Sequence, residues 1–164
     1  MDAILERARH IRLLVLDVDG VLTDGRLHLS PLGEEFKVFH VRDGSGLVAV
    51  QRAGVTVAIV SGRDSAAVSR RAEELGIRRV HQGIADKGAE LERLMTEVGC
   101  AAAETACVGD DTPDAPMLSR AGLAIAVADA HPALIAVAHW VTKAKGGRGA
   151  VREVCDLLLS ARAA

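Results

Sequence analysis

The sequence predicts an α/β fold in which helices cover both faces of a parallel central sheet. Four continuous apolar runs of strand length lie at 13–16, 55–60, 105–108 and 123–127. Such runs are typical of strands that are buried on both faces. Longer amphipathic stretches that end at a glycine separate them, as expected for helices with glycine at the C-terminus. The alternation of the two patterns predicts right-handed strand–helix–strand crossovers.

The helices are predicted in three places. One pattern contains Leu47 and ends at Gly54, and two others cover 64–75 and 86–98. A short strand is expected at 80–81, just before the last of these helices.

Residues 25–41 break the alternation. Two runs of alternating polarity, at 26–29 and 36–39, flank a turn-rich segment at 30–33. This pattern predicts a β-hairpin inserted between the first strand and the first long helix. Because the hairpin is partly apolar and has no partner within the predicted core, we expect it to pack on another subunit.

Composition narrows the class of protein. A length of 164 residues and a hydrophobic fraction of 49% predict one domain, 1–164, with a substantial core. The net charge of −2 disfavours a nucleic acid or an anionic membrane as partner, since both attract a cationic excess. Aromatic residues make up only 2% of the chain, which disfavours recognition by ring stacking.

Cysteine usage and the N-terminus favour a cytoplasmic protein. The three cysteines are far apart and form no CxxC pair, so reduced thiols are expected rather than disulfides or a zinc site. The first residues lack the basic start and apolar run of a signal peptide, and no segment has the length of a membrane span.

Reactive side chains follow several of the predicted strands. Asp17 and Asp19 follow the first strand, Ser61-Gly62-Arg63 follows the second, and Gly109-Asp110-Asp111 follows a later one, while Lys87 opens a helix. In a parallel sheet, ligands bind beyond the carboxyl ends of the strands. We therefore expect these groups to meet in one site.

The chemistry of these groups points to phosphoryl transfer. One carboxylate of the Asp17–Asp19 pair can attack as a nucleophile while the other donates and accepts protons. Mg²⁺ prefers oxygen ligands, so Asp17 and Asp110 suit it. Ser61, the Gly62 N–H and Lys87 can stabilise charge on a transferring phosphoryl group.

Each segment alone also has a purely structural interpretation. An Asp-x-Asp pair is common in turns, and Asp111 and Asp114 can simply favour the start of the next helix, where Thr112 and Pro113 fit the first positions. The joint occurrence of four such segments at predicted strand ends favours the catalytic interpretation.

These segments also carry a resemblance to known proteins. Residues 17–25, 61–63, 86–87 and 109–114 resemble the four motifs of the haloacid dehalogenase superfamily. Within it, the stretches at 41–47, 127–132 and 145–159 resemble the 3-deoxy-D-manno-octulosonate 8-phosphate phosphatase family. The match runs from about residue 10 to 160. It implies a three-layer, Rossmann-like fold without a cap domain, ending in a Gly-rich segment and a helix at about 145–160.

The resemblance implies roles for the matching residues. Asp17 would form an aspartyl-phosphate, and Asp19 would protonate the leaving group and then activate water. Mg²⁺ would be held by Asp17, the Asp19 carbonyl and Asp110. Ser61 and Lys87 would hold the phosphoryl group.

The implied reaction is Mg²⁺-dependent hydrolysis of 3-deoxy-D-manno-octulosonate 8-phosphate in lipopolysaccharide precursor synthesis. The substrate carries a carboxylate, which favours arginine near the site. Besides Asp19, the candidate substrate-binding residues are His40, Arg42, Asp43, Gly44, Arg63 and Arg71. The family also implies a homotetramer in which neighbouring subunits close each active site, with the hairpin at 25–41 and the segment 146–149 at the interfaces.

Two alternative functions stay open at this point. A phosphatase for a nine-carbon, sialic-acid-type 9-phosphate would have the same motifs, because loop shape sets the sugar length. A non-catalytic phospho-accepting or oligomerisation module would also use a strand-end aspartate, a lysine and Mg²⁺. The position of Asp19, two residues after Asp17, disfavours the second alternative because it supplies the proton donor that turnover needs.

Overall fold

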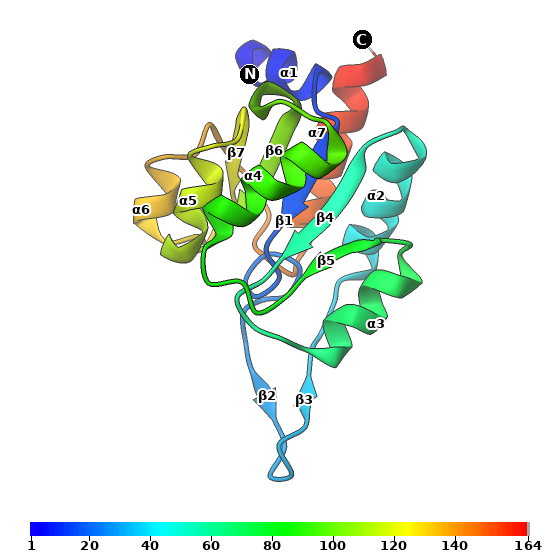
Figure 1. Cartoon of the computed structure of the whole chain (residues 1–164), viewed down its shortest axis with the longest axis vertical. Coiled ribbons are helices and arrows are strands. Elements are labelled where there is room, and N and C mark those ends of the chain that lie inside the picture. Colours follow the sequence, from blue (N-terminus) through cyan, green and yellow to red (C-terminus); the bar gives the residue numbers. More distant parts are fainter. Residues whose placement is uncertain (164) are drawn as a thin grey trace.

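The computed structural model describes residues 1–163 and confirms the predicted α/β fold. A six-stranded, fully parallel sheet forms its centre (Figure 1). In spatial order the strands are β5 (Arg79–His81), β4 (Thr56–Val60), β1 (Leu13–Leu16), β6 (Thr105–Gly109), β7 (Leu123–Ala126) and β8 (Trp140–Val141). The first strand of the chain, β1, is therefore central, and its four residues are fully buried.

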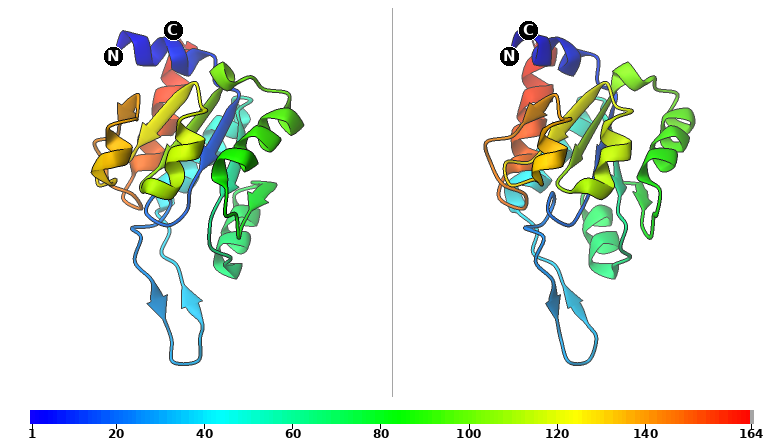
Figure 2. Two further views of the ribbon diagram at one scale, coloured as in Figure 1. Left: turned by 60° about the vertical axis from the view of Figure 1, so that its left-hand side comes forward. Right: turned by 90° about the vertical axis from the view of Figure 1, so that its left-hand side faces the viewer.

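Helices cover both faces of the sheet. The main helices are α1 (Asp2–Arg9), α2 (Val41–Arg52), α3 (Ala66–Glu74), α4 (Lys87–Val98), α5 (Ala115–Leu118), α6 (Pro132–Ile135) and α7 (Ala150–Ala163), with short 3-10 turns at Ala102–Glu104 and Thr112–Asp114. Helices α2 and α7 lie on one face, and α4 and α5 lie on the other (Figures 1 and 2). The chain leaves β1 for neighbours on both sides, so the carboxyl end of β1 is the switch point where such sheets bind ligands.

Local signals place the helix that carries Lys87. The Asp86 side chain accepts hydrogen bonds from the Gly88 and Ala89 N–H groups, at 3.0 Å each, and so caps α4. Gly99 ends α4 in the left-handed conformation, with φ of 69°. The predicted helix at 86–98 is thus confirmed, and its cap holds Lys87 in the first turn.

Helix α2 begins at Val41, well before the predicted apolar pattern at Leu47. Its first turns contain Gly44 and Gly46, which disfavour a helix in isolation. A Cβ at Gly44 would lie 3.0 Å from Leu75 of α3, and one at Gly46 would lie 3.0 Å from the Cβ of Cys155 of α7. The two glycines therefore allow close packing between helices, which outweighs their low helix propensity.

The predicted hairpin is present but short. Its strands are β2 (His28–Leu29) and β3 (Glu35–Phe36), and the hairpin projects away from the body of the molecule (Figure 1). The flanking residues of the predicted runs, 26–27 and 37–39, are not in strands. The projecting part buries no core residue, because the core consists of the sheet and its covering helices.

Three small elements have no counterpart in the sequence prediction. They are α1, α6 and β8, of which the last two contain only four and two residues. Elements as short as α6 and β8 show no periodic pattern of apolar residues from which they could be predicted. Within residues 1–163, no helix has the length and apolar character needed to cross a membrane.

The glycine-rich segment at 146–149 packs against the loop that follows β1. The Gly147 N–H donates to the Val21 carbonyl at 2.9 Å. A Cβ at Gly146 would overlap the Gly20 carbonyl, and one at Gly147 would overlap the backbone of Thr23 and Asp24. Two backbones therefore touch directly, which only glycine permits.

We predict that Gly147→Ala destabilises the protein more than Gly76→Ala. Both glycines have positive φ, 65° and 70°. Alanine at Gly76 meets no heavy atom within 4 Å among the residues described and incurs only the backbone strain of about 1 kcal/mol. Alanine at Gly147 must also displace the loop after β1, at a further cost of about 1–3 kcal/mol. Equal losses of unfolding free energy in urea titrations would contradict this packing.

Candidate active site

A cleft of about 360 Å³ opens at the carboxyl edge of the sheet. Seven residues predicted from the sequence line it: Asp17, Asp19, Ser61, Gly62, Arg63, Lys87 and Asp110. Gly25, Asp111, Pro113 and Asp114 complete the lining. The volume lies in the range of small-molecule sites. The fold thus brings together segments that are far apart in the sequence.

The centre of the cleft is a buried ion-pair network. The Lys87 ammonium donates to Asp17 Oδ1 and to Asp114 Oδ1, both at 2.6 Å. The three side chains are at most 7% exposed. Burial works against the charged ammonium, but the carboxylates of Asp17 and Asp114 outweigh it and raise the pKa of Lys87. Lys87 therefore stays charged and fixes the direction of the Asp17 side chain.

Asp114 anchors this network to the backbone. Its Oδ2 accepts hydrogen bonds from the Asp110 N–H at 2.9 Å and from the Asp111 N–H at 3.3 Å. Sequence analysis assigned Asp114 only to the start of a helix and missed its contact with Lys87. The sequence did contain a signal for the position of this side chain. Asp114 follows Asp110 by about one turn, so its carboxylate can reach the backbone of the same loop.

Three carboxylates crowd together at this point. Oxygens of Asp17, Asp110 and Asp114 lie within 4.8 Å of one another. Burial, then the charges of Asp17 and Asp114, raise the pKa of Asp110 to about 8. Burial and Asp114 raise the pKa of Asp17 to about 6, against the opposing effect of Lys87. Lys87 alone therefore does not balance the cluster.

The cluster fits a divalent cation. Mg²⁺ takes hard oxygen ligands and one or two carboxylates, and its charge opposes the burial and the repulsion that raise these pKa values. The Asp110 carboxylate reaches across to Gly20, where φ is 93° and a Cβ would overlap Asp110 Oδ2. A glycine at this position keeps the space between the two loops open.

The segment after β4 forms the opposite wall. The Ser61 N–H donates to the His81 carbonyl at 2.9 Å and so continues the sheet. The Arg63 N–H lies 3.4 Å from Ser61 Oγ in a tight turn. A Cβ at Gly62 would have as its nearest neighbour the Ile84 carbonyl at 3.7 Å, so this backbone is accessible to a ligand.

A second charged cluster surrounds Asp19. Lys37 donates to Asp19 Oδ1 at 2.6 Å and to Glu35 at 3.0 Å. Arg63 pairs with Glu35 at 2.9 Å and with Asp19 Oδ2 at 3.6 Å. Lys37 and Glu35 are not among the residues predicted from the sequence, because only the return of the hairpin to the body brings them to Asp19 and Arg63.

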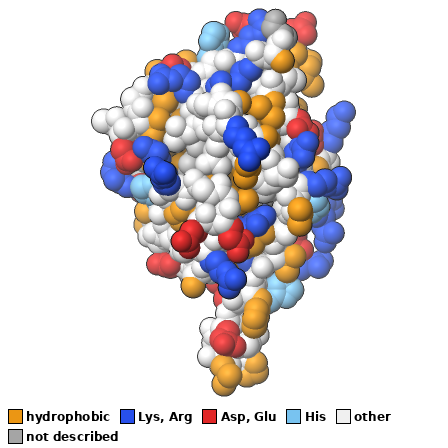
Figure 3. All heavy atoms as spheres, turned by 90° about the vertical axis from the view of Figure 1, so that its right-hand side faces the viewer, with side chains coloured by type: hydrophobic (Ala, Val, Ile, Leu, Met, Phe, Trp, Pro, Cys, Tyr) orange, Lys and Arg blue, Asp and Glu red, His pale blue; other side chains and the backbone are white. Residues whose placement is uncertain are grey.

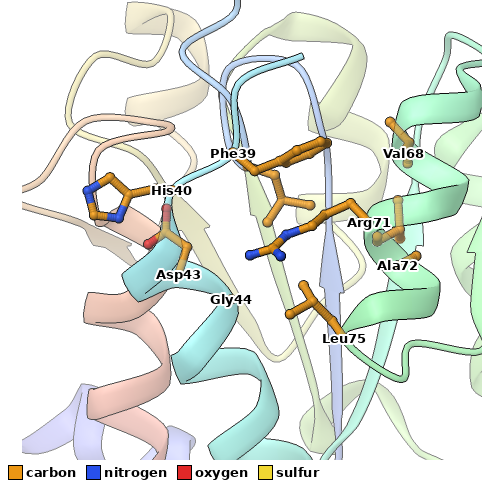
Figure 4. Close-up of a pocket in the computed structure, with 10 residues that line it drawn as sticks. Phe39, His40, Asp43, Gly44, Val68, Arg71, Ala72 and Leu75 are labelled. Carbon is orange, nitrogen blue, oxygen red and sulfur yellow. The ribbon is translucent and has the colours of Figure 1, made fainter. Parts of the chain in front are cut away.

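Several candidate substrate-binding residues lie outside the cleft. Gly44, Asp43, His40 and Arg71 line a separate cavity of about 10 Å³ between α2 and α3 (Figure 4). Figure 4 shows Arg71 extending from α3 toward Gly44. Arg42 lines a third depression with His40 and Arg148. The early start of α2 separates these residues from the cleft, so only Arg63 joins Asp19 there.

The contacts of Asp43 lie within the fold rather than in the cleft. It is buried, and its Oδ1 accepts from the Arg152 N–H at 2.8 Å at the start of α7. Its Oδ2 has no hydrogen-bond partner in the described part of the chain. Burial raises the pKa of Asp43 despite that backbone hydrogen bond.

The buried contact between Lys87 and the strand-end Asp17 fits the haloacid dehalogenase-like hydrolases that the sequence motifs resemble, and comparisons with known proteins identify the family. The family model with that description matches residues 79–154. A protein of Yersinia pestis described as 3-deoxy-D-manno-octulosonate 8-phosphate phosphatase KdsC is 47% identical over 161 residues, which are 98% of this chain and 86% of the relative. The chain belongs to the family of these phosphatases.

Solved structures agree with this assignment. The 3-deoxy-D-manno-octulosonate 8-phosphate phosphatase of Moraxella catarrhalis, solved with magnesium, phosphate and KDO, is 43% identical with a TM-score of 0.97 and matches 99% of this chain and 94% of its own. The cobalt-bound Haemophilus influenzae phosphatase YrbI is 41% identical with a TM-score of 0.93 and matches 96% and 92% of the two chains.

We predict that Mg²⁺ stabilises the protein more at high pH than at low pH. In the metal-free protein Asp110 has a pKa of about 8, raised from 3.8. The stability that its protonation contributes is present below the unfolded value and is lost as pH rises toward 8. Mg²⁺ replaces that proton and so binds more tightly at high pH.

Thermal unfolding with Mg²⁺ or with a chelator, at about pH 5.5 and 8.5, measures the effect. The increase in Tm on adding Mg²⁺ should be larger at the higher pH. Asp110→Asn should abolish most of the increase at both. An increase independent of pH would mean that these carboxylates are not the cation ligands.

Proposed function

We propose that the protein is a Mg²⁺-dependent phosphatase that hydrolyses 3-deoxy-D-manno-octulosonate 8-phosphate to the free sugar acid and phosphate. The observation that carries this proposal is the pair Asp17 and Asp19 in one cleft, with Asp17 held by Lys87 at 2.6 Å. The relatives named above act on this substrate according to their descriptions. The reaction belongs to lipopolysaccharide precursor synthesis.

The proposed mechanism has two steps. In the first, Asp17 attacks phosphorus and the bond to the C8 oxygen breaks, while Asp19 donates a proton to that oxygen. In the second, Asp19 takes a proton from a water molecule that attacks the aspartyl-phosphate, releasing phosphate and freeing Asp17. Asp19 is thus restored for the next cycle.

The remaining residues bind and neutralise charge. Ser61, the Gly62 N–H and Lys87 are proposed to hold the phosphoryl oxygens. Asp17, the Asp19 carbonyl and Asp110 are proposed to hold Mg²⁺, which supplies positive charge for the phosphoryl oxygens when bound.

Arg63 is the strongest candidate for the substrate carboxylate. It lies in the cleft and is half-exposed, so its guanidinium is accessible for a bidentate contact. His40, Arg42, Asp43, Gly44 and Arg71 stay weaker candidates, since they line other cavities.

We also propose a cytoplasmic homotetramer whose subunits close one another's active sites. The hairpin exposes large apolar side chains in one place, over β2 and β3 (Figure 3). They are Leu27, Leu29, Leu32, Phe36 and Val38. Such a patch favours burial against a protein surface. The three cysteines are buried and unpaired, as is usual in a reducing compartment.

We predict that Asp17→Asn and Asp19→Asn each lower kcat by at least about 10²-fold, because one removes the nucleophile and the other the proton donor. Removing Mg²⁺ with a chelator should lower the kcat of the wild type by a similar factor. Phosphate release from eight-carbon and nine-carbon sugar-acid phosphates measures both activity and specificity. Ready turnover by Asp17→Asn would exclude the covalent mechanism. A higher kcat/KM for the nine-carbon sugar-acid phosphate would contradict the proposed eight-carbon substrate.

We predict that the hairpin mediates assembly. The double variant Leu29→Glu/Phe36→Glu should form a smaller species than the wild type in size-exclusion chromatography with light scattering, because charge on the apolar patch opposes burial. Val137→Glu alters an exposed apolar residue outside the hairpin and is the control. A monomeric wild type would rule out the tetramer.

A further inference from the structure

We propose that Lys37 is a positioning residue that fixes the Asp19 carboxylate for proton transfer and links that step to the hairpin. This inference rests on the proposed role of Asp19. It concerns a residue that none of the strand-end motifs contains, on the returning arm of the hairpin.

Lys37 is the buried member of the cluster around Asp19. Its side chain is 2% exposed, whereas those of Asp19 and Glu35 are 21% and 15% exposed. Its ammonium contacts both carboxylates, at 2.6 Å and 3.0 Å. A buried ammonium needs such partners, and bonds between two charged groups at these distances are among the strongest hydrogen bonds in proteins.

The two oxygens of Asp19 face different cations. Oδ1 accepts from Lys37, and Oδ2 lies 3.6 Å from Arg63 Nε. Glu35 pairs with both cations, so the cluster contains two positive and two negative side chains in alternation. Arg63 is 46% exposed and is the cation that a substrate carboxylate can reach. When Arg63 turns to the substrate, Lys37 is the contact that still holds Asp19.

Asp19 needs such a contact. The carboxylate of an aspartate rotates about a broad, two-fold torsion, so the backbone alone does not fix its direction. Proton transfer requires an approach of roughly 2.6–3.2 Å to the leaving oxygen. An error of about 1 Å in position can cost on the order of 10²-fold in rate.

The returning arm of the hairpin supplies this contact, with Glu35 in β3 and Lys37 just after it. The two side chains lie on the same side of this segment, since Lys37 contacts both Glu35 and Asp19. Phe36 lies between them and is 60% exposed, on the opposite side of the segment. This segment thus contacts Asp19 and Arg63 through its charged side chains and exposes apolar side chains on its other side. Any contact that fixes the apolar side also fixes Lys37.

A double-mutant cycle tests the proposal. Lys37→Met keeps most of the side-chain stem but removes the charge, and it should lower kcat/KM about 10–100-fold. If Lys37 acts through Asp19, the double variant Lys37→Met/Asp19→Asn should be no slower than Asp19→Asn alone. Losses that simply multiply would show that Lys37 acts independently of Asp19 and would overturn the proposal.

The leaving group provides a second measurement. An aryl phosphate such as p-nitrophenyl phosphate leaves without much help from an acid, whereas the sugar alkoxide needs a proton. Asp19→Asn should therefore reduce kcat/KM more for the sugar phosphate than for the aryl phosphate, and Lys37→Met should show the same preference to a smaller degree. A purely structural role would lower both values equally.

Controls separate this inference from the proposed function. Lys37→Arg keeps the charge and should retain most activity, which also covers the case in which Lys37→Met folds poorly. Lys143→Met, at an exposed lysine, should leave the rate unchanged. Normal turnover by Asp19→Asn would contradict the proposed function itself. An inactive Asp19→Asn with a fully active Lys37→Met would contradict this inference alone.

Discussion

Electrostatic repulsion between buried carboxylates governs this active site. Asp17, Asp110 and Asp114 bring oxygens within 4.8 Å of one another at the edge of a sheet, in a partly desolvated cleft. Such a group persists only if positive charge lies among its members. Lys87 supplies positive charge by bonding to two of the three, while burial, together with the neighbouring carboxylates, still raises the pKa values of Asp17 and Asp110. The cluster thus suits a divalent cation, whose charge offsets the effects that raise these pKa values.

The backbone around the cluster is arranged to keep the charges at fixed distances. Gly20, with its positive φ, leaves room for the Asp110 carboxylate, and Gly147 packs directly on the loop after β1. Asp114 ties Lys87 to the loop after β6 through two backbone N–H groups. A second cluster, around Asp19, is balanced by Arg63 from the segment after β4 and by Lys37 from the hairpin. One cluster orients the proposed nucleophile, and the other orients the proposed acid.

Sequence patterns predicted what depends on local chemistry. The strands, the helix at 86–98 and the glycine that ends it follow from side-chain type and spacing, and so the strand-end motifs could be placed together. Contacts between residues that are distant in the sequence were harder to predict. Lys37 reaches Asp19 only because the hairpin folds back, and Arg71 lies beside Gly44 in a cavity separate from the cleft. The very short β8 has no periodic signal at all.

The central claim is that Asp17 becomes covalently phosphorylated. The most direct measurement mixes p-nitrophenyl phosphate, whose leaving group needs little help from an acid, with the Asp19→Asn variant, quenches the reaction in acid and locates the phosphate by mass spectrometry of peptides. Without its proposed base the second step slows, so the phosphoenzyme should accumulate. We expect one phosphate per chain, on Asp17, in the presence of Mg²⁺. A phosphate on another residue, or substrate consumption with no covalent phosphate at any time, would contradict it.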